Sequence, residues 1–269
     1  MEDGLDDCQS SCLNCNGNSV LAWDEAVAFY AGSLEASDGS GTGGLIMYSL
    51  SNKRCANFKT CGAKGDEVSG TSYNNLAILQ EFKAGQNYVN NGECNMARTS
   101  KEDISKLMTV PLVQGTLRYA YITAYQSTNA EKEEAEGASF AAAVLPYVHA
   151  CSEADATIIA DNMRVGVAQG ANFPAVLNAF QRNYKCMGIT CADVGGLWNE
   201  GTQSYESNFS PCNDCKNGKA GVAIGASVGS LLGVGLIGLA VVAYRRRRSS
   251  ATGSKDSNTF ASGVEQPTV

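Results

Sequence analysis

The side chains of this sequence that could do chemistry are mainly oxygen donors. Ten tyrosines lie between residues 30 and 205, together with many carboxylates. A hard trivalent cation such as ferric iron prefers phenolate and carboxylate oxygens, and its charge can displace the proton of a phenol whose ordinary pKa is about 10. The candidate metal ligands that we select on this chemistry are Tyr30, Tyr48, Tyr119, Tyr147, His149, Asp24 and Glu25.

An anion that binds together with such a metal needs a cationic partner. Arg118 directly precedes Tyr119 and is our candidate anion-binding residue. The same side chains also have plainer explanations. A tyrosine at helical spacing is usually a core residue whose hydroxyl has a partner, and Asp24 and Glu25 suit the start of a helix. His149 suits a helix cap or a core position.

Several classes of enzyme are excluded by the inventory of residues. His149 is the one histidine of the chain, which rules out zinc sites built from two or three histidines. The sequence contains no GxSxG or Walker motif, and the glycine-rich stretch 39–44 lacks the lysine of a phosphate loop. We therefore expect a protein that is not an enzyme; a hydrolase would need a cryptic carboxylate pair such as Glu25 with Glu35.

All 11 cysteines precede residue 220. Such a cysteine content is typical of disulfide-bonded domains in oxidising compartments. The close pairs that could form short loops are Cys55 with Cys61 and Cys186 with Cys191, although spacing leaves the connectivity open. A zinc site from the two CxxC motifs at 12–15 and 212–215 is the alternative. The odd number indicates either a missing upstream stretch or an intermolecular disulfide.

A membrane span is indicated near the carboxyl end. Residues 220–244 carry no charge and are followed by four arginines, 245–248. As a helix these residues would extend about 37 Å, enough to cross a hydrocarbon core of about 30 Å. The arginines predict that the tail 245–269 is cytosolic. A buried helix of a soluble protein is the alternative.

The charged residues are also distributed unevenly on the two sides of this stretch. The tail has five basic and two acidic residues and a charge of +3, whereas 15 basic and 25 acidic side chains leave the first 219 residues at −10. We expect a single-pass type I protein of the plasma membrane, with its amino-terminal domain extracellular or periplasmic. The sequence MEDGLDDC lacks the apolar region of a signal peptide, so we expect the leader to be missing.

The partners follow from these charges and from the span. A total charge of −7 argues against nucleic acid, and the arginine-rich tail suits contact with anionic membrane lipid. Small residues recur every fourth position in the span, a pattern that favours a homodimer but also occurs without one. These helix-packing candidates are Gly221, Gly225, Gly229 and Gly233.

The remaining sequence predicts a mainly α fold stapled by disulfides. Apolar spacing predicts helices at 23–34, 76–88, 112–125 and 129–150, with caps at Ser72, Ser152 and Asn172 and an interruption at Pro111. Residues 76–94 resemble 174–191, which indicates either two similar halves or chance similarity. The expected parts are a Cys-rich segment 1–18, a helical ectodomain 19–205, a linker 206–219, the span 220–244 and the tail 245–269.

Several blocks of the sequence resemble one family. WDEAVAFYAGSLE (23–35), NKRCANFKTC (52–61), VPLVQGTLRYAY (110–121), EGASFAAAVLPYVHAC (136–151) and CMGITCADVGGLW (186–198) are similar to algal low-iron-inducible periplasmic, iron-assimilating proteins, which include phytotransferrin. The resemblance covers roughly residues 20–200. It implies high-affinity capture of ferric iron at a cell surface, with carbonate as the synergistic anion. Some members are known instead for induction by high carbon dioxide.

The function expected from these observations is ferric-iron binding for uptake. A surface adhesion or structural protein without a metal is the alternative, because tyrosines and cysteines would then serve stability alone.

Overall fold

The computed structural model describes residues 1–9, 19–32, 46–126, 130–167 and 170–212, which all belong to one compact unit, Met1–Gly221. These residues are mainly helical and contain four disulfide bonds, which confirms the predicted mainly α, disulfide-stapled fold. The predicted span 220–244, its four glycines and the tail lie outside the described residues. Within the described ranges, no helix combines the length and apolarity needed to cross a membrane.

Five helices surround the first core. They are α1 (Glu2–Gln9), α2 (Ser19–Ala31), α3 (Met47–Phe58), α4 (Tyr73–Asn90) and α5 (Cys94–Leu107). The side chains at the centre of this core include Trp23, Ile78, Phe82 and Ile104, all of which are buried. Trp23 donates its indole N–H to the carbonyl of Phe82 at 2.9 Å, so its one polar group is satisfied inside the core.

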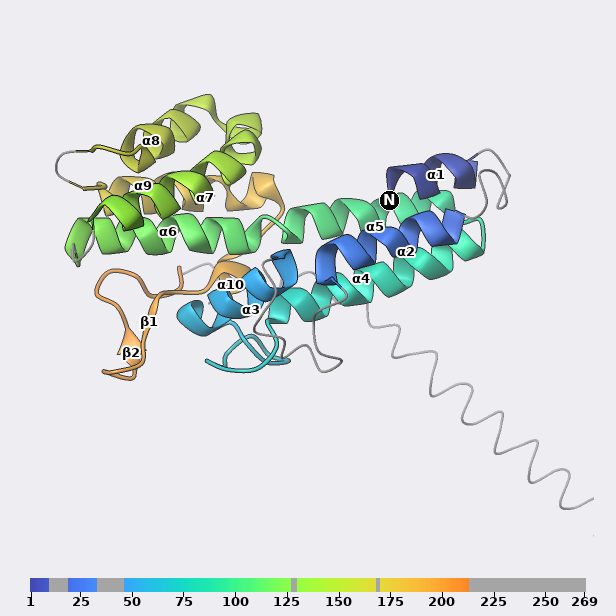
Figure 1. The fold of residues 1–269 in the computed structure, drawn as a ribbon, viewed down its shortest axis with the longest axis horizontal. Helices are drawn as coiled ribbons and strands as arrows, with labels where there is room; N and C mark the ends of the chain where they lie inside the picture. The colour runs from blue at the N-terminus through green and yellow to red at the C-terminus, as the bar shows by residue number, and fades with distance from the viewer. Residues whose placement is uncertain (10–18, 33–45, 127–129, 168–169, 213–269) are drawn as a thin grey trace, which may run out of the picture. The chain divides into compact units, whose positions relative to one another are not determined.

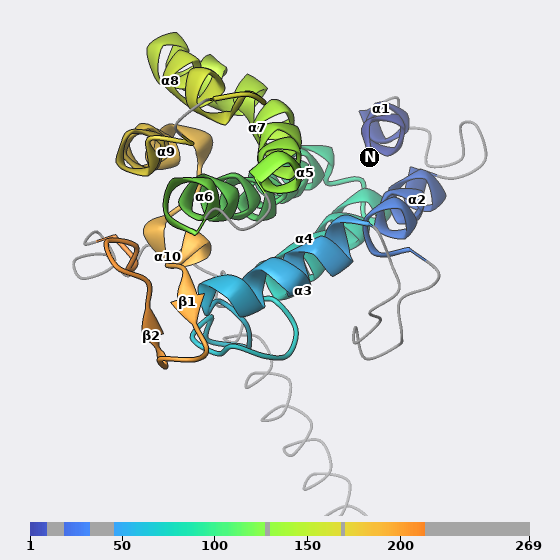
Figure 2. The ribbon, with the colours of Figure 1, turned by 60° about the vertical axis from the view of Figure 1, so that its left-hand side comes forward.

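The second core is organised around α6 (Val110–Tyr125). The elements that follow it are α7 (Ala130–Cys151), α8 (Glu153–Met163), α9 (Phe173–Met187), α10 (Cys191–Val194), β1 (Trp198–Asn199) and β2 (Ser204–Tyr205). Figures 1 and 2 show α7, α8 and α9 on one side of α6, with α3 and α10 on the other. Strands β1 and β2 form a small antiparallel pair. Helix α3 thus contributes to the first core with Tyr48 and to the second with Phe58.

The helix boundaries agree with most of the predicted signals. Helix α5 ends at Leu107 and α6 begins at Val110, with Pro111 in its first turn, where a missing N–H costs nothing. Ser152 and Asn172 accept hydrogen bonds from backbone N–H groups and cap α8 and α9 as expected. Ser72 stands at the start of α4 but its side chain makes no capping hydrogen bond, and its hydroxyl accepts a hydrogen bond from Ser51.

The disulfides connect helices more often than they close short loops. Cys55 is bonded to Cys61, as their spacing allowed. Cys186 and Cys191 are not bonded to each other: Cys186 pairs with Cys151 and Cys191 with Cys212. Their pairing as a short loop was therefore wrong, because Cys186 lies in the last turn of α9, beside the end of α7. The fourth bond joins Cys8 of α1 to Cys94 of α5.

Candidate functional site

The candidate site lies between α6 and α7, where a phenol meets a carboxylate. The hydroxyl of Tyr119 donates a hydrogen bond to Oε2 of Glu136. Tyr119 is 7% exposed, whereas the Glu136 side chain is 39% exposed, so the pair connects the core to the surface. Glu136 also lies 3.8 Å from the ammonium nitrogen of Lys132 on the same helix. A phenol and a carboxylate in this arrangement offer two hard oxygen donors to one cation.

A buried arginine lies beside this pair. Arg54 comes from α3, is 2% exposed, and places its guanidinium carbon 5.9 Å from the centre of the Tyr119 ring and 5.6 Å from that of Phe140. Its Nε and Nη1 atoms are buried and have no hydrogen-bond partner among the described residues. Unpartnered N–H groups of a buried cation are costly, and a hydrogen-bond acceptor such as water or an oxyanion can satisfy them.

Arg118 adds a second positive charge to the site. Its guanidinium carbon lies 5.3 Å from the centre of the Tyr119 ring, and the residue is half-buried. Burial raises the pKa of the Tyr119 phenol, and its hydrogen bond to Glu136 raises it further, while both arginines oppose this shift. Burial also lowers the pKa of Arg54. The phenol is therefore neutral in the metal-free protein and needs a strong cation to ionise.

The close approach of α6 and α7 positions the Tyr119 ring. The ring stacks on Phe140 with centroids 5.8 Å apart and planes inclined by 17°. Gly115 and Gly137 provide the room, since a Cβ at Gly115 would collide with Phe140 and one at Gly137 would lie 3.0 Å from Cβ of Tyr119. Arg54 reaches the same ring from α3 because it lies on the buried face of that helix, together with Ser51, Cys55 and Phe58.

Two other candidate tyrosines lie together in the first core. The rings of Tyr30 and Tyr48 meet edge to face with centroids 6.1 Å apart. The Tyr30 hydroxyl donates to Oδ1 of Asn75, whose amide nitrogen donates to the carbonyl of Tyr48 at 2.9 Å. Burial raises the pKa of Tyr30 far above its ordinary value. In this environment Tyr30 acts as a neutral hydrogen-bond donor in the core.

The remaining candidate ligands are dispersed. Tyr147 and His149 are exposed on α7, and Glu25 is exposed on α2.

Asp24 accepts a hydrogen bond from Gln86 at 2.6 Å. These two side chains and Lys83 are the polar residues that line a groove of about 410 Å³ between α2 and α4. The other lining residues of the groove are Val27, Ala28, Ala31, Gly32, Leu79 and Phe82.

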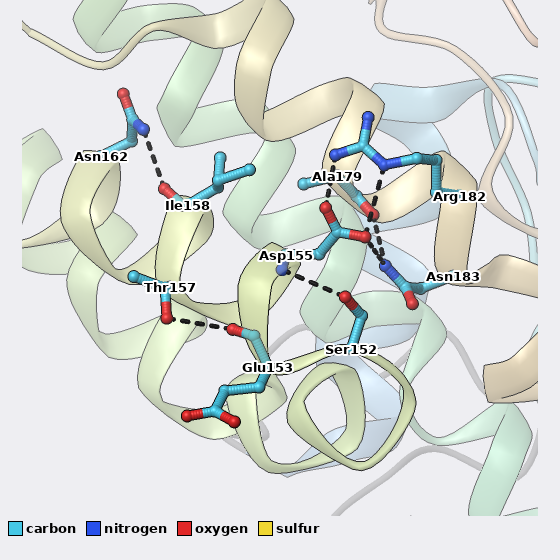
Figure 3. A network of polar contacts seen from close by, with 9 residues as sticks. All are labelled: Ser152, Glu153, Asp155, Thr157, Ile158, Asn162, Ala179, Arg182 and Asn183. Atoms are coloured by element: carbon cyan, nitrogen blue, oxygen red, sulfur yellow. Dashed lines mark hydrogen bonds and ion pairs between the residues drawn. The ribbon is translucent and has the colours of Figure 1, made fainter.

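A separate ion pair joins α8 to α9. Arg182 forms an ion pair with Asp155, which also accepts a hydrogen bond from Nδ2 of Asn183 at 2.7 Å. Figure 3 shows both side chains of α9 directed at this carboxylate. The hydrogen bond from Arg182 holds the pKa of Asp155 below its usual range. Because every partner of Asp155 belongs to the packing of the two helices, we interpret this network as structural.

At this site the structure thus brings together Arg118 and Tyr119 from the predicted set and adds Arg54 and Glu136. Arg54 was not predicted, because the buried face of α3 on which it lies, where a charge is unusual, is known only from the structure. Glu136 carries no distinguishing signal in the sequence, because acidic residues near the start of a helix such as α7 are typical of a favourable interaction with the helix dipole. Within the described ranges, no three histidine, cysteine, aspartate or glutamate side chains form a metal-binding group.

Comparison with known proteins gives no relative to compare with this site, since no family model, curated protein or solved structure matches the chain.

Proposed function

We propose that the chain is a non-enzymatic, cell-surface protein that binds ferric iron for uptake, with carbonate as the synergistic anion. The observation that carries the proposal is the convergence of Tyr119 and Glu136 with two arginines, one of which has buried nitrogens without a partner. Tyr119 and Glu136 would hold the ferric ion as cargo. Arg54 and Arg118 would hold the carbonate.

The chemistry of these four residues fits that cargo. Ferric iron favours phenolate and carboxylate oxygens over the imidazole and thiolate ligands that softer metals prefer. Tyr119 loses its proton to solvent on binding, and Glu136 gives up the hydrogen bond that it accepts from the phenol. Two guanidinium groups match the two negative charges of carbonate, and their planar N–H groups suit its planar oxygens.

The location belongs to the same proposal. The charge-free stretch 220–244 and the arginines that follow it support a type I plasma-membrane protein with a short cytosolic tail. The four disulfides support an extracellular or periplasmic domain. The resemblance to algal iron-assimilating proteins supports the uptake role. A homodimer through the glycine-rich span remains part of this proposal.

The direct test is calorimetric titration of the protein with ferric citrate, with and without bicarbonate. Saturable binding that requires bicarbonate, with a visible phenolate-to-iron absorption band, is expected. Tyr119→Phe keeps the stacking on Phe140 but removes the oxygen, and it should abolish the band. Tyr121→Phe is a matched control, because Tyr121 also lies on α6 and donates to a carboxylate, that of Glu206, at 3.2 Å. Absence of saturable binding in both conditions would refute the proposal.

An adhesion or structural role is the second candidate, and one observation favours it. Helix α2 exposes the large apolar side chains of Phe29 (84%) and Leu21 (57%), which a binding partner would cover. Enrichment of the protein at cell contacts, together with unchanged iron uptake after its deletion, would support this role over the first.

A further inference from the structure

Glu133 has a buried carboxylate oxygen that the site described above does not use. It lies on α7 and precedes Glu136 by three residues, about one helical turn. Its Oε2 atom is buried and has no hydrogen-bond partner in the described part of the chain. A buried carboxylate oxygen that lacks both a donor and a cation costs free energy, so its surroundings favour a bound positive charge.

The position of Glu133 on α7 places it on the face that Tyr119 contacts. Residues 133, 136, 137 and 140 share one face of a helix, because they are spaced by three, four and seven. Glu136 accepts the hydrogen bond of Tyr119, Gly137 lies against Cβ of Tyr119, and Phe140 stacks on its ring. Glu133 is the fourth member of this face.

The neighbouring acids on the same helix differ from Glu133 in having partners or in being exposed. Oε2 of Glu134 accepts a hydrogen bond from the backbone N–H of Gly166 at 3.0 Å. Glu136 has Tyr119 and Lys132. Glu131 is exposed to solvent. Glu133 is partly buried like Glu134 and Glu136, and it differs from them in that its buried Oε2 atom has no partner among the described residues.

We infer that Glu133 is a third oxygen ligand of the ferric ion, an inference that rests on the proposed function. The charges of the cargo and of the five groups that would hold it then balance, and the ammonium of Lys132, which is 64% exposed, is left to the solvent. One phenolate and two carboxylates neutralise the trivalent cation, and the two arginines neutralise the carbonate. Without Glu133 the loaded site would keep a net positive charge in a largely buried environment, which is unfavourable.

The test compares Glu133→Gln with Glu131→Gln, which removes the same charge from the same end of α7 at an exposed position. Ferric citrate is titrated in bicarbonate buffer, and the thermal unfolding of each metal-free protein is measured in parallel. Glu133→Gln should weaken ferric binding by roughly tenfold or more, since even indirect partners of a metal contribute about 10–100-fold. It should also shift the phenolate-to-iron absorption band and leave the unfolding temperature of the metal-free protein unchanged or higher. Glu131→Gln should do none of these.

Each contrary result has a distinct meaning. Equal ferric affinity of Glu133→Gln and the unmodified protein would overturn the assignment of Glu133 while the proposed function stands. A lowered unfolding temperature of metal-free Glu133→Gln would overturn it in favour of a structural role. If the unmodified protein does not bind ferric ion, the proposed function fails and the role of Glu133 fails with it.

Discussion

The guanidinium carbon of Arg54 lies 5.9 Å from the centre of the Tyr119 ring, although the two residues come from different helices. This contact places a desolvated cation beside a phenol that donates to a carboxylate. Burial lowers the pKa of the arginine and raises that of the tyrosine, so burial disfavours the charged form of each group, although the guanidinium keeps its proton. A ferric ion and an oxyanion would reverse both tendencies at once.

Replacement of Arg54 by methionine tests whether this arginine serves binding or folding. The change keeps an apolar stem in the core and removes two buried nitrogens that lack partners. The free energy of unfolding of the metal-free protein should stay the same or rise by about 1–2 kcal/mol, because a buried, poorly compensated charge is often replaced at no cost. Bicarbonate-dependent ferric binding should fall by roughly tenfold or more.

Urea unfolding and ferric titration measure the two effects separately. Arg98→Met is the control, since Arg98 is a surface residue of α5 that lies 3.9 Å from Glu2, and surface pairs contribute little. A clear loss of stability in Arg54→Met with normal binding would show that Arg54 acts through its stacking on Tyr119 and Phe140 alone.

The sequence predicts the types of residue found at the candidate site, but it does not predict which residues of these types lie in contact. Arg118 and Tyr119 are adjacent in the chain, so their association needed only a helix. Arg54 reaches Tyr119 because α3 packs on α6, and no local pattern specifies that packing. Tyr30 has the same chemistry as Tyr119, yet its neighbour is the Asn75 amide rather than a carboxylate.

The similarity of 76–94 to 174–191 shows the same limit. Phe82 and Phe180 are both buried, as matching positions in a repeat should be. Each segment also contains an Asn-Tyr pair, at 87–88 and at 183–184, and the surroundings of the two pairs differ: Asn183 and Tyr184 are buried, whereas Asn87 is exposed. Apolar spacing therefore predicts that both segments are helices, and the surroundings of their polar residues depend on the neighbouring helices.

The disulfides should differ in their contributions to stability according to the loops that they close. The Cys8–Cys94 bond spans 86 residues, and the Cys55–Cys61 bond spans six. Chain-entropy arguments predict that the longer loop stabilises by roughly 2 kcal/mol more. Replacing both cysteines of each pair by serine and comparing urea unfolding curves tests this. Equal losses for the two double variants would contradict the expectation.

Acid should weaken the packing of α8 on α9 through Asp155. Because the folded pKa of Asp155 is lowered, its contribution is fully present above its unfolded value of about 3.9 and is lost as the pH falls through the folded value. Asp155→Asn should therefore cost about 1–2 kcal/mol at pH 7 and progressively less below pH of about 4. Urea unfolding across pH measures this. Asp161→Asn, an exposed change on the same helix, should leave the pH dependence intact.

Gly137 sets the distance between α7 and Tyr119, so its replacement by alanine should disturb the site. The added Cβ would lie 2.8 Å from Cε of Met163 and 3.0 Å from Cβ of Tyr119. Met163 can turn aside, but the Tyr119 Cβ is fixed to the backbone of α6 and must shift.

A gain of about 1 kcal/mol in helix propensity opposes a packing cost of about 1–3 kcal/mol. We expect a net loss of about 1 kcal/mol and a several-fold weaker ferric affinity, both measured against Ser139→Ala, an exposed change on α7. Unchanged affinity in Gly137→Ala would mean that the Tyr119–Glu136 geometry does not control binding.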